Sequence, residues 1–73
     1  MINKNILITG ALGQDGKLLS KILIKQKYNV IGCIKKKKYK NKIQKVIYKV
    51  IDIANKNEVI DIIKKYNPSA VVH

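Results

Sequence analysis

Three glycines spaced three residues apart are the part of this sequence best suited to bind a ligand. Gly10, Gly13 and Gly16 follow an apolar run at residues 6–8, and a helical pattern of apolar residues begins after them. Gly10 can turn the chain tightly because it has no Cβ, and at Gly13 the backbone N–H groups can approach a bound phosphate. The following helix would direct its unpaired N–H groups toward that anion. The spacing therefore predicts a strand, a phosphate-binding turn and a helix start, with a turn that serves packing alone as the alternative.

Two charged groups further along the chain would suit the other end of a dinucleotide. Four lysines, beginning with Lys35 and Lys36, follow an apolar run at residues 30–34. An acid after this strand favours NAD, whereas a cation accommodates the 2′-phosphate, so the lysines favour NADP over NAD. A solvated basic loop is the alternative, since lysine is a point charge rather than a planar fork. Asp52 and Ile53 end the next apolar run, and Asp52 is one of only four acids in the chain.

Alternating strand and helix patterns are predicted to position these residues. Strands are expected over 5–9, 30–34 and 46–51, with a fourth beginning at Ala70, because these runs are apolar or β-branched. A first helix is expected over about 14–27, with its apolar stripe on the sheet: Leu18, Leu19, Ile22 and Leu23. Asn55 is predicted to cap a second helix, with Glu58 reaching back, and Asn67-Pro68 to end it. Its predicted apolar face holds Val59, Ile62, Ile63 and Tyr66.

The residues around the glycines also resemble a known enzyme superfamily. The Gly-x-x-Gly-x-x-Gly spacing is similar to that of short-chain dehydrogenases/reductases, and in particular to their extended branch of NAD-dependent epimerases and dehydratases. Within that branch, Thr9-Gly10 followed by Gln14-Asp15-Gly16 is similar to GDP-mannose 4,6-dehydratases. The resemblance implies an α/β fold over residues 1–73. It would be a partial Rossmann (doubly wound parallel sheet) fold with the order β-α-β-β-α-β, strand order 3-2-1-4, truncated within the NAD(P)-binding domain.

The same resemblance implies which residues contact the cofactor. The pyrophosphate would lie against the glycine turn, formed by Thr9, Gly10, Gly13, Gln14, Asp15 and Gly16. Lys35 and Lys36 stand where the dehydratases have paired arginines, which also implies NADP. Asp52 would bind the exocyclic amine of adenine while the amide of Ile53 contacts the ring. Asp15 as a simple helix-start residue and Asp52 as a loop acid remain the alternatives.

The catalytic pair of this superfamily, Tyr-x-x-x-Lys, is absent, because none of the four tyrosines is followed four residues later by lysine. The substrate-binding part is absent as well. We therefore expect an NADP-binding N-terminal fragment, marginally stable and without turnover. The complete enzyme would be a lyase that converts GDP-mannose to GDP-4-dehydro-6-deoxy-mannose, and a homo-oligomer. A fragment of another extended member, a nucleotide-sugar epimerase or reductase, is the alternative, against which only Gln14 and Asp15 argue.

Composition limits the remaining possibilities. The net charge of +12 comes from 16 lysines without arginine, so a small basic nucleic-acid-binding module is a further alternative. A nucleic-acid surface usually adds arginine and stacking aromatics, which argues against it. No apolar run is long enough to cross a bilayer and no signal peptide is evident, so we expect a cytoplasmic location without membrane contact. The single cysteine, Cys33, is expected to be a core residue, and His73 a strand residue rather than a catalytic base.

Overall fold

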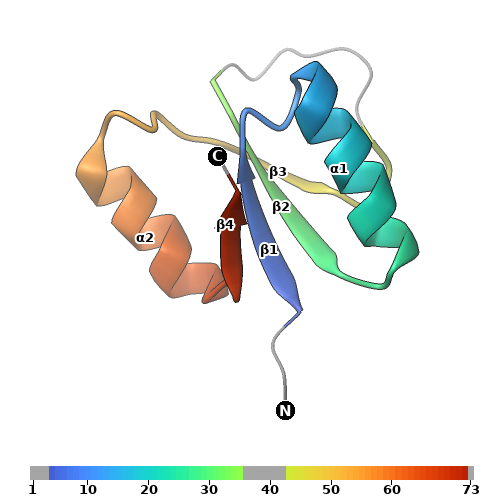
Figure 1. Ribbon diagram of the computed structural model, residues 1–73. Coiled ribbons are helices and arrows are strands. Elements are labelled where there is room, and N and C mark those ends of the chain that lie inside the picture. The colour runs from blue at the N-terminus through green and yellow to red at the C-terminus, as the bar shows by residue number, and fades with distance from the viewer. Residues whose placement is uncertain (1–3, 36–42, 73) are drawn as a thin grey trace.

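The computed structural model describes residues 4–35 and 43–72, which form one parallel sheet with a helix on each face (Figure 1). Chain order is β1 (Asn5–Thr9), α1 (Gln14–Lys25), β2 (Asn29–Ile34), β3 (Ile47–Val50), α2 (Lys56–Tyr66) and β4 (Ala70–Val72). The sheet order is β3-β2-β1-β4, and all three pairings are parallel. The predicted α/β fold and strand order 3-2-1-4 are confirmed.

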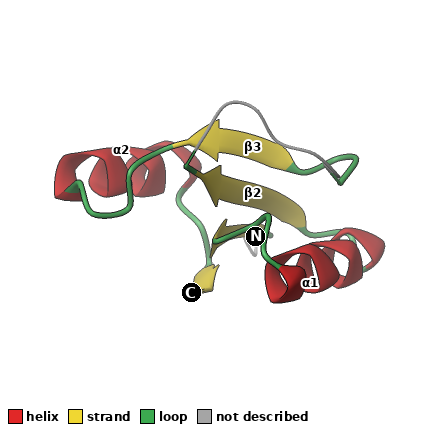
Figure 2. Ribbon diagram, turned by 90° about the horizontal axis from the view of Figure 1, so that it is seen from above, coloured by secondary structure: helices red, strands yellow, loops and turns green. Residues whose placement is uncertain are grey.

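The two helices lie on opposite faces of the sheet (Figure 2). Successive strand side chains point to opposite faces, so each strand supplies two separate cores. The core on the α1 side includes Ile6, Ile8 and Val30, and the core on the α2 side includes Leu7, Ile31 and Ile62. This two-sided burial explains why β1 and β2 read as continuous apolar runs.

Some element boundaries differ from the predicted ones by one or two residues, whereas β1 and the starts of α1 and β4 lie where predicted. α1 ends at Lys25 rather than near Lys27, because Lys27 adopts a left-handed conformation with φ of 71°. β2 begins one residue early at Asn29, β3 is shorter at Ile47–Val50, and β4 is described to Val72, so His73 lies outside the described residues. α2 ends where predicted, at a left-handed Asn67 with φ of 44°.

The predicted inner stripe of α1 is partly wrong. Leu18 is 61% exposed and Ile22 is 45% exposed, whereas Ser20 is fully buried and donates a hydrogen bond to the carbonyl oxygen of Gly16 at 2.7 Å. Leu19 and Leu23 of the predicted stripe do pack against the core and are partly buried. The face of α1 toward the sheet therefore runs through Gly16, Leu19, Ser20 and Leu23, because the first turn of the helix packs against the glycine turn. On α2, Ile62 is buried as predicted while Ile63 is 37% exposed.

Candidate functional site

The carboxyl ends of the strands and the N-termini of both helices lie along one edge of the sheet, at the top of Figure 1. β1 connects to β2 on one side while β4 pairs on its other side, so the strand order reverses at β1. Ligands of open α/β sheets bind outside the carboxyl ends at such a reversal. The glycine turn follows β1 at this place.

The glycine turn leaves the start of α1 open. Gly10 has a φ of 62°, and its carbonyl oxygen accepts a hydrogen bond from the amide of Gly13 at 3.0 Å. Gly13 is the N-cap of α1, and it has no side chain that could accept hydrogen bonds from the first amides of the helix. In contrast, the Asn55 side chain caps α2 by accepting hydrogen bonds from the amides of Asn57 and Glu58. Among the residues that the structure describes, no side chain caps the start of α1, so its first amides can receive an external acceptor.

Close packing holds this turn against the sheet. A Cβ on Gly16 would lie 2.5 Å from the carbonyl oxygen of Gly10, and a Cβ on Gly32 would lie 2.7 Å from the Cβ of Ala11. Gly16 therefore keeps the helix against the turn itself, whereas Gly32 makes room for the turn on β2. Gly32 is not among the predicted site residues, although a glycine inside a strand is a known signal of close approach.

A cleft of about 590 Å³ opens beside the turn. Its lining brings together the carboxyl ends of β1 and β2 with the segment that follows β3: Thr9, Gly10, Ala11, Leu12, Gly13, Cys33, Ile34, Lys35, Ile51 and Ile53. A second hollow of about 350 Å³ lies against the first turn of α1 and includes Gln14, Asp15 and Gly16. Both spaces share Thr9, Gly10 and Gly13. The predicted phosphate-contact residues are thus gathered around one turn.

The charged residues predicted for the far end of the ligand are placed at the same edge. Lys35 lines the main cleft and also an adjoining hollow of about 400 Å³ that contains Asp52 and Glu58. Asp52 does not line the main cleft, but its neighbour Ile53 does. Lys36 lies outside the described residues.

Nested hydrogen bonds shape the turn that contains Asp52 and Ile53. The Asp52 carbonyl oxygen accepts from the amide of Asn55 at 2.9 Å, and one carboxylate oxygen of Asp52 accepts from the amide of Ala54 at 2.9 Å. Glu58 reaches back, but not to the N-cap amide as a capping box predicts: its carboxylate accepts from the amide of Asp52 at 3.4 Å, because the amide of Asn55 already donates to the Asp52 carbonyl oxygen. Asp52 is therefore part of the loop structure, and a carboxylate retains further acceptor positions for a ligand.

Two residues that border the cleft are held by the fold itself. The Thr9 hydroxyl donates to the carbonyl oxygen of Val72 at 3.3 Å, which joins β1 to β4 beside the turn. Cys33 is 3% exposed, as predicted for a core residue, and burial raises the pKa of its thiol. A neutral buried thiol is a poor nucleophile.

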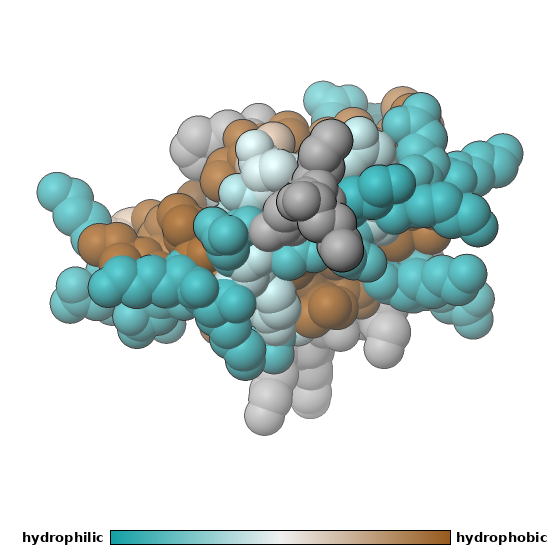
Figure 3. Space-filling view, turned by 90° about the horizontal axis from the view of Figure 1, so that it is seen from below, coloured by the Kyte–Doolittle hydropathy of each residue, from teal (hydrophilic) through white to brown (hydrophobic). Residues whose placement is uncertain are grey.

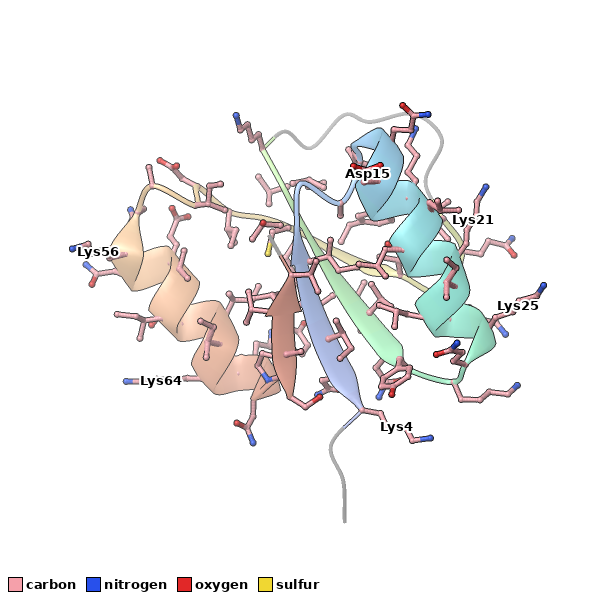
Figure 4. The ribbon with its side chains drawn as sticks, viewed as in Figure 1. Lys4, Asp15, Lys21, Lys25, Lys56 and Lys64 are labelled. Carbon is pink, nitrogen blue, oxygen red and sulfur yellow. The ribbon has the colours of Figure 1, made fainter. Side chains whose placement is uncertain are left out.

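Charged side chains surround this framework. The labelled lysines of both helices point away from the sheet, and Asp15 lies in the first turn of α1 (Figure 4). The residues that the structure describes contain no helix long and apolar enough to cross a membrane.

Residues 6–73 match the sequence model of the NAD dependent epimerase/dehydratase family. The chain belongs to this family. No protein of curated function matches the chain.

Solved structures of similar fold agree with this assignment. L-Threonine dehydrogenase from Clostridium difficile is 36% identical over 100% of the chain, with a TM-score of 0.80. The Bordetella bronchiseptica enzyme WbmH, solved in complex with NAD+, is 25% identical over 99% of the chain, with a TM-score of 0.82. A short-chain dehydrogenase from Leptospira borgpetersenii with bound NAD+ is 25% identical over 94%, with a TM-score of 0.73. The chain spans 24%, 26% and 30% of these three structures, respectively.

Proposed function

We propose that this chain is the NADP-binding portion of an extended short-chain dehydrogenase/reductase, with catalytic and substrate-binding parts that lie outside it. The observation that carries the proposal is the cleft between the glycine turn and Lys35. Backbone amides at the uncapped start of α1 and a cation after β2 border it together. Such an arrangement suits a ligand with a pyrophosphate at one place and a further phosphate at another.

Each part of the cofactor is assigned to described residues. The glycine turn from Thr9 to Gly16 would bind the pyrophosphate, and Lys35 the 2′-phosphate. Asp52 and Ile53 would bind adenine, whose ring the apolar side chains Ile34 and Ile51 of the cleft suit. That two of the similar structures contain NAD+ supports a dinucleotide at this place.

For the complete enzyme we propose a nucleotide-sugar dehydratase of the GDP-mannose 4,6-dehydratase type. Gln14 and Asp15 in the first turn of α1 support this choice, because they match the dehydratase pattern. The cofactor would supply hydride transfer at the sugar without net consumption. The residues of this chain would hold the cofactor and would not carry out the dehydration.

A second candidate is a portion of a dehydrogenase related to the Clostridium difficile enzyme, and the 36% identity over the whole chain favours it. Assays of the complete enzyme with GDP-mannose and with L-threonine would distinguish the two candidates. Conversion of GDP-mannose supports the dehydratase, and oxidation of L-threonine supports the dehydrogenase.

The cofactor proposal is tested by titrating the purified 73-residue chain with NADP and with NAD. We expect NADP to bind more tightly, and Lys35→Gln to weaken NADP binding roughly tenfold with little effect on NAD, because only NADP carries the 2′-phosphate. Lys25→Gln, at the far end of α1, is the matched control and should bind as the wild type does. Equal loss of both cofactors in Lys35→Gln would contradict the assigned phosphate contact.

The nucleic-acid alternative predicts a different result in the same assay. Binding of a DNA oligonucleotide should fall steeply between 0.05 and 0.3 M salt, at roughly one power of salt concentration for each phosphate contact. NADP held by backbone amides should depend less on salt. Steep salt dependence without competition by NADP would favour the nucleic-acid module.

A further inference from the structure

The turn after β3 is built so that one backbone amide remains for a ligand. The amides of Asp52, Ala54 and Asn55 all donate hydrogen bonds, to Glu58 or within the turn itself. In the described part of the chain the amide of Ile53 has no hydrogen-bond partner, and Ile53 is the residue of this turn that lines the main cleft. The turn therefore offers one donor, the Ile53 amide, next to one acceptor, the Asp52 carboxylate.

That donor–acceptor pair has a defined complement. A 6-aminopurine presents a ring nitrogen that accepts and an exocyclic amine that donates, whereas a 6-oxopurine has a protonated ring nitrogen and an accepting oxygen at the same places. The oxo form would set donor against donor at Ile53 and acceptor against acceptor at Asp52. A donor or acceptor that loses its water and finds no partner costs more binding free energy than the hydrogen bond alone would have contributed.

Glu58 is the residue that holds this pair in place from outside the turn. Its carboxylate, on the first turn of α2, accepts the amide of Asp52 at 3.4 Å, while its own amide is held by the Asn55 side chain at 3.3 Å. These contacts link the start of α2 to the turn that carries Asp52 and Ile53. Without the Glu58 carboxylate, the Asp52 amide would become a second open donor beside the first.

We propose that Glu58 is a positioning residue that makes the Asp52–Ile53 turn selective for a 6-aminopurine over a 6-oxopurine. The proposal rests on the proposed function, since it concerns the adenine end of the same cofactor. Glu58 would not touch the purine itself. It acts on the base through the Asp52 amide.

The test compares NADP with its deamino form, in which hypoxanthine replaces adenine, on the 73-residue chain and its variants. We expect the wild type to bind NADP roughly tenfold more tightly than deamino-NADP. Glu58→Ala should reduce this ratio toward one, mainly by weakening NADP, and Glu58→Gln should retain most of it because its side-chain oxygen still accepts. Asp61→Ala, which removes an exposed acid one turn later on α2, is the matched control and should leave the ratio unchanged.

The outcomes separate this inference from the proposed function. Equal binding of NADP and deamino-NADP by the wild type would overturn the selectivity while the dinucleotide site stands. A ratio that falls equally in Asp61→Ala and Glu58→Ala would overturn the role of Glu58. Binding of neither compound would refute the proposed function and the inference together. Urea unfolding midpoints of all variants show that the ratios are measured on folded chains.

Discussion

At the scale of single residues, the turn after β1 depends on backbone atoms that approach one another closely. The carbonyl oxygen of Gly10 lies 3.3 Å from the position of a Cβ on Gly13 but only 2.5 Å from that of a Cβ on Gly16. The neighbouring atoms at Gly16 are backbone atoms of the turn, which cannot move away as a flexible side chain could. Gly16 is therefore the more constrained of the two positions.

We predict that Gly16→Ala destabilises the chain by about 1–3 kcal/mol, because the added methyl group forces the helix start away from the turn. Gly13→Ala serves as the control and should cost clearly less, since its methyl group meets one atom at 3.3 Å. Urea unfolding followed by circular dichroism measures both. Equal stability of the two variants would contradict the close packing of Gly16 against the turn.

Cys33 gives the chain a pH-dependent contribution to stability. Burial raises the pKa of its thiol in the folded state, so the folded chain holds the proton more tightly than the unfolded chain does. This contribution is fully present below the thiol pKa of the unfolded chain and is lost as the pH rises through the folded-state pKa.

We therefore predict that the difference in unfolding free energy between wild type and Cys33→Ala shrinks as the pH rises above about 9. The two chains differ only at residue 33, so the difference isolates the thiol. Urea unfolding at pH 7, 8, 9 and 10 measures it. A difference that stays constant over this range would show that the thiol is not buried in the folded chain.

At the scale of elements, β4 is the last strand of the described sheet and carries an exposed apolar side chain. Val71 is 52% exposed in this three-residue strand, and Ile60 and Ile63 of α2 are also exposed. Figure 3 shows apolar side chains at the surface on the side of the molecule where α2 lies. Exposed apolar edges favour pairing with other chains.

We predict that Val71→Lys reduces concentration-dependent self-association of the 73-residue chain, because a charge on the edge opposes strand pairing. Leu18→Lys is the matched control: it adds the same charge at a side chain that is 61% exposed on α1, away from the edge. Sedimentation velocity at several concentrations measures the effect. If both variants reduce association equally, net charge rather than the β4 edge is responsible.

At the scale of the whole molecule, sixteen lysines against four acids make repulsion a general feature of the chain. The labelled lysines on α1 and α2 point outward on opposite sides of the sheet (Figure 4). Like charges on a compact fold destabilise it relative to the expanded chain, and salt screens them beyond about 10 Å at 0.1 M.

We predict that the urea midpoint of unfolding rises between 0.02 and 0.2 M sodium chloride. Replacing both Lys56 and Lys64 by glutamine should raise the midpoint at low salt and reduce the dependence on salt. Urea is uncharged, so the denaturant itself does not screen the repulsion between the lysines. A midpoint independent of salt would show that the charges are too far apart to destabilise the fold.

Local sequence determined which segments become strands and helices and where the chain turns between them. The run at residues 6–8, the glycine spacing and the Asn55 cap act within a few residues, so each could be predicted without knowing the fold, and the order of the strands followed from the family resemblance. The gathering of Lys35 and Ile53 beside the glycine turn also follows from that order, because parallel strands end at one edge.

Tertiary contacts determined which side chains are buried and which backbone amides have partners, and neither can be read from periodicity alone. The buried face of α1 passes through Ser20 rather than Leu18, because contact between Gly16 and the Gly10 carbonyl oxygen sets how the helix is rotated on the sheet. Gly32 accommodates Ala11 only because β2 lies beneath the turn. The amide of Asp52 likewise has a partner only because Glu58, six residues further along the chain, lies close enough to accept it. These contacts form between atoms that only folding brings close together. The spacing of residues in the sequence does not specify the distances between those atoms.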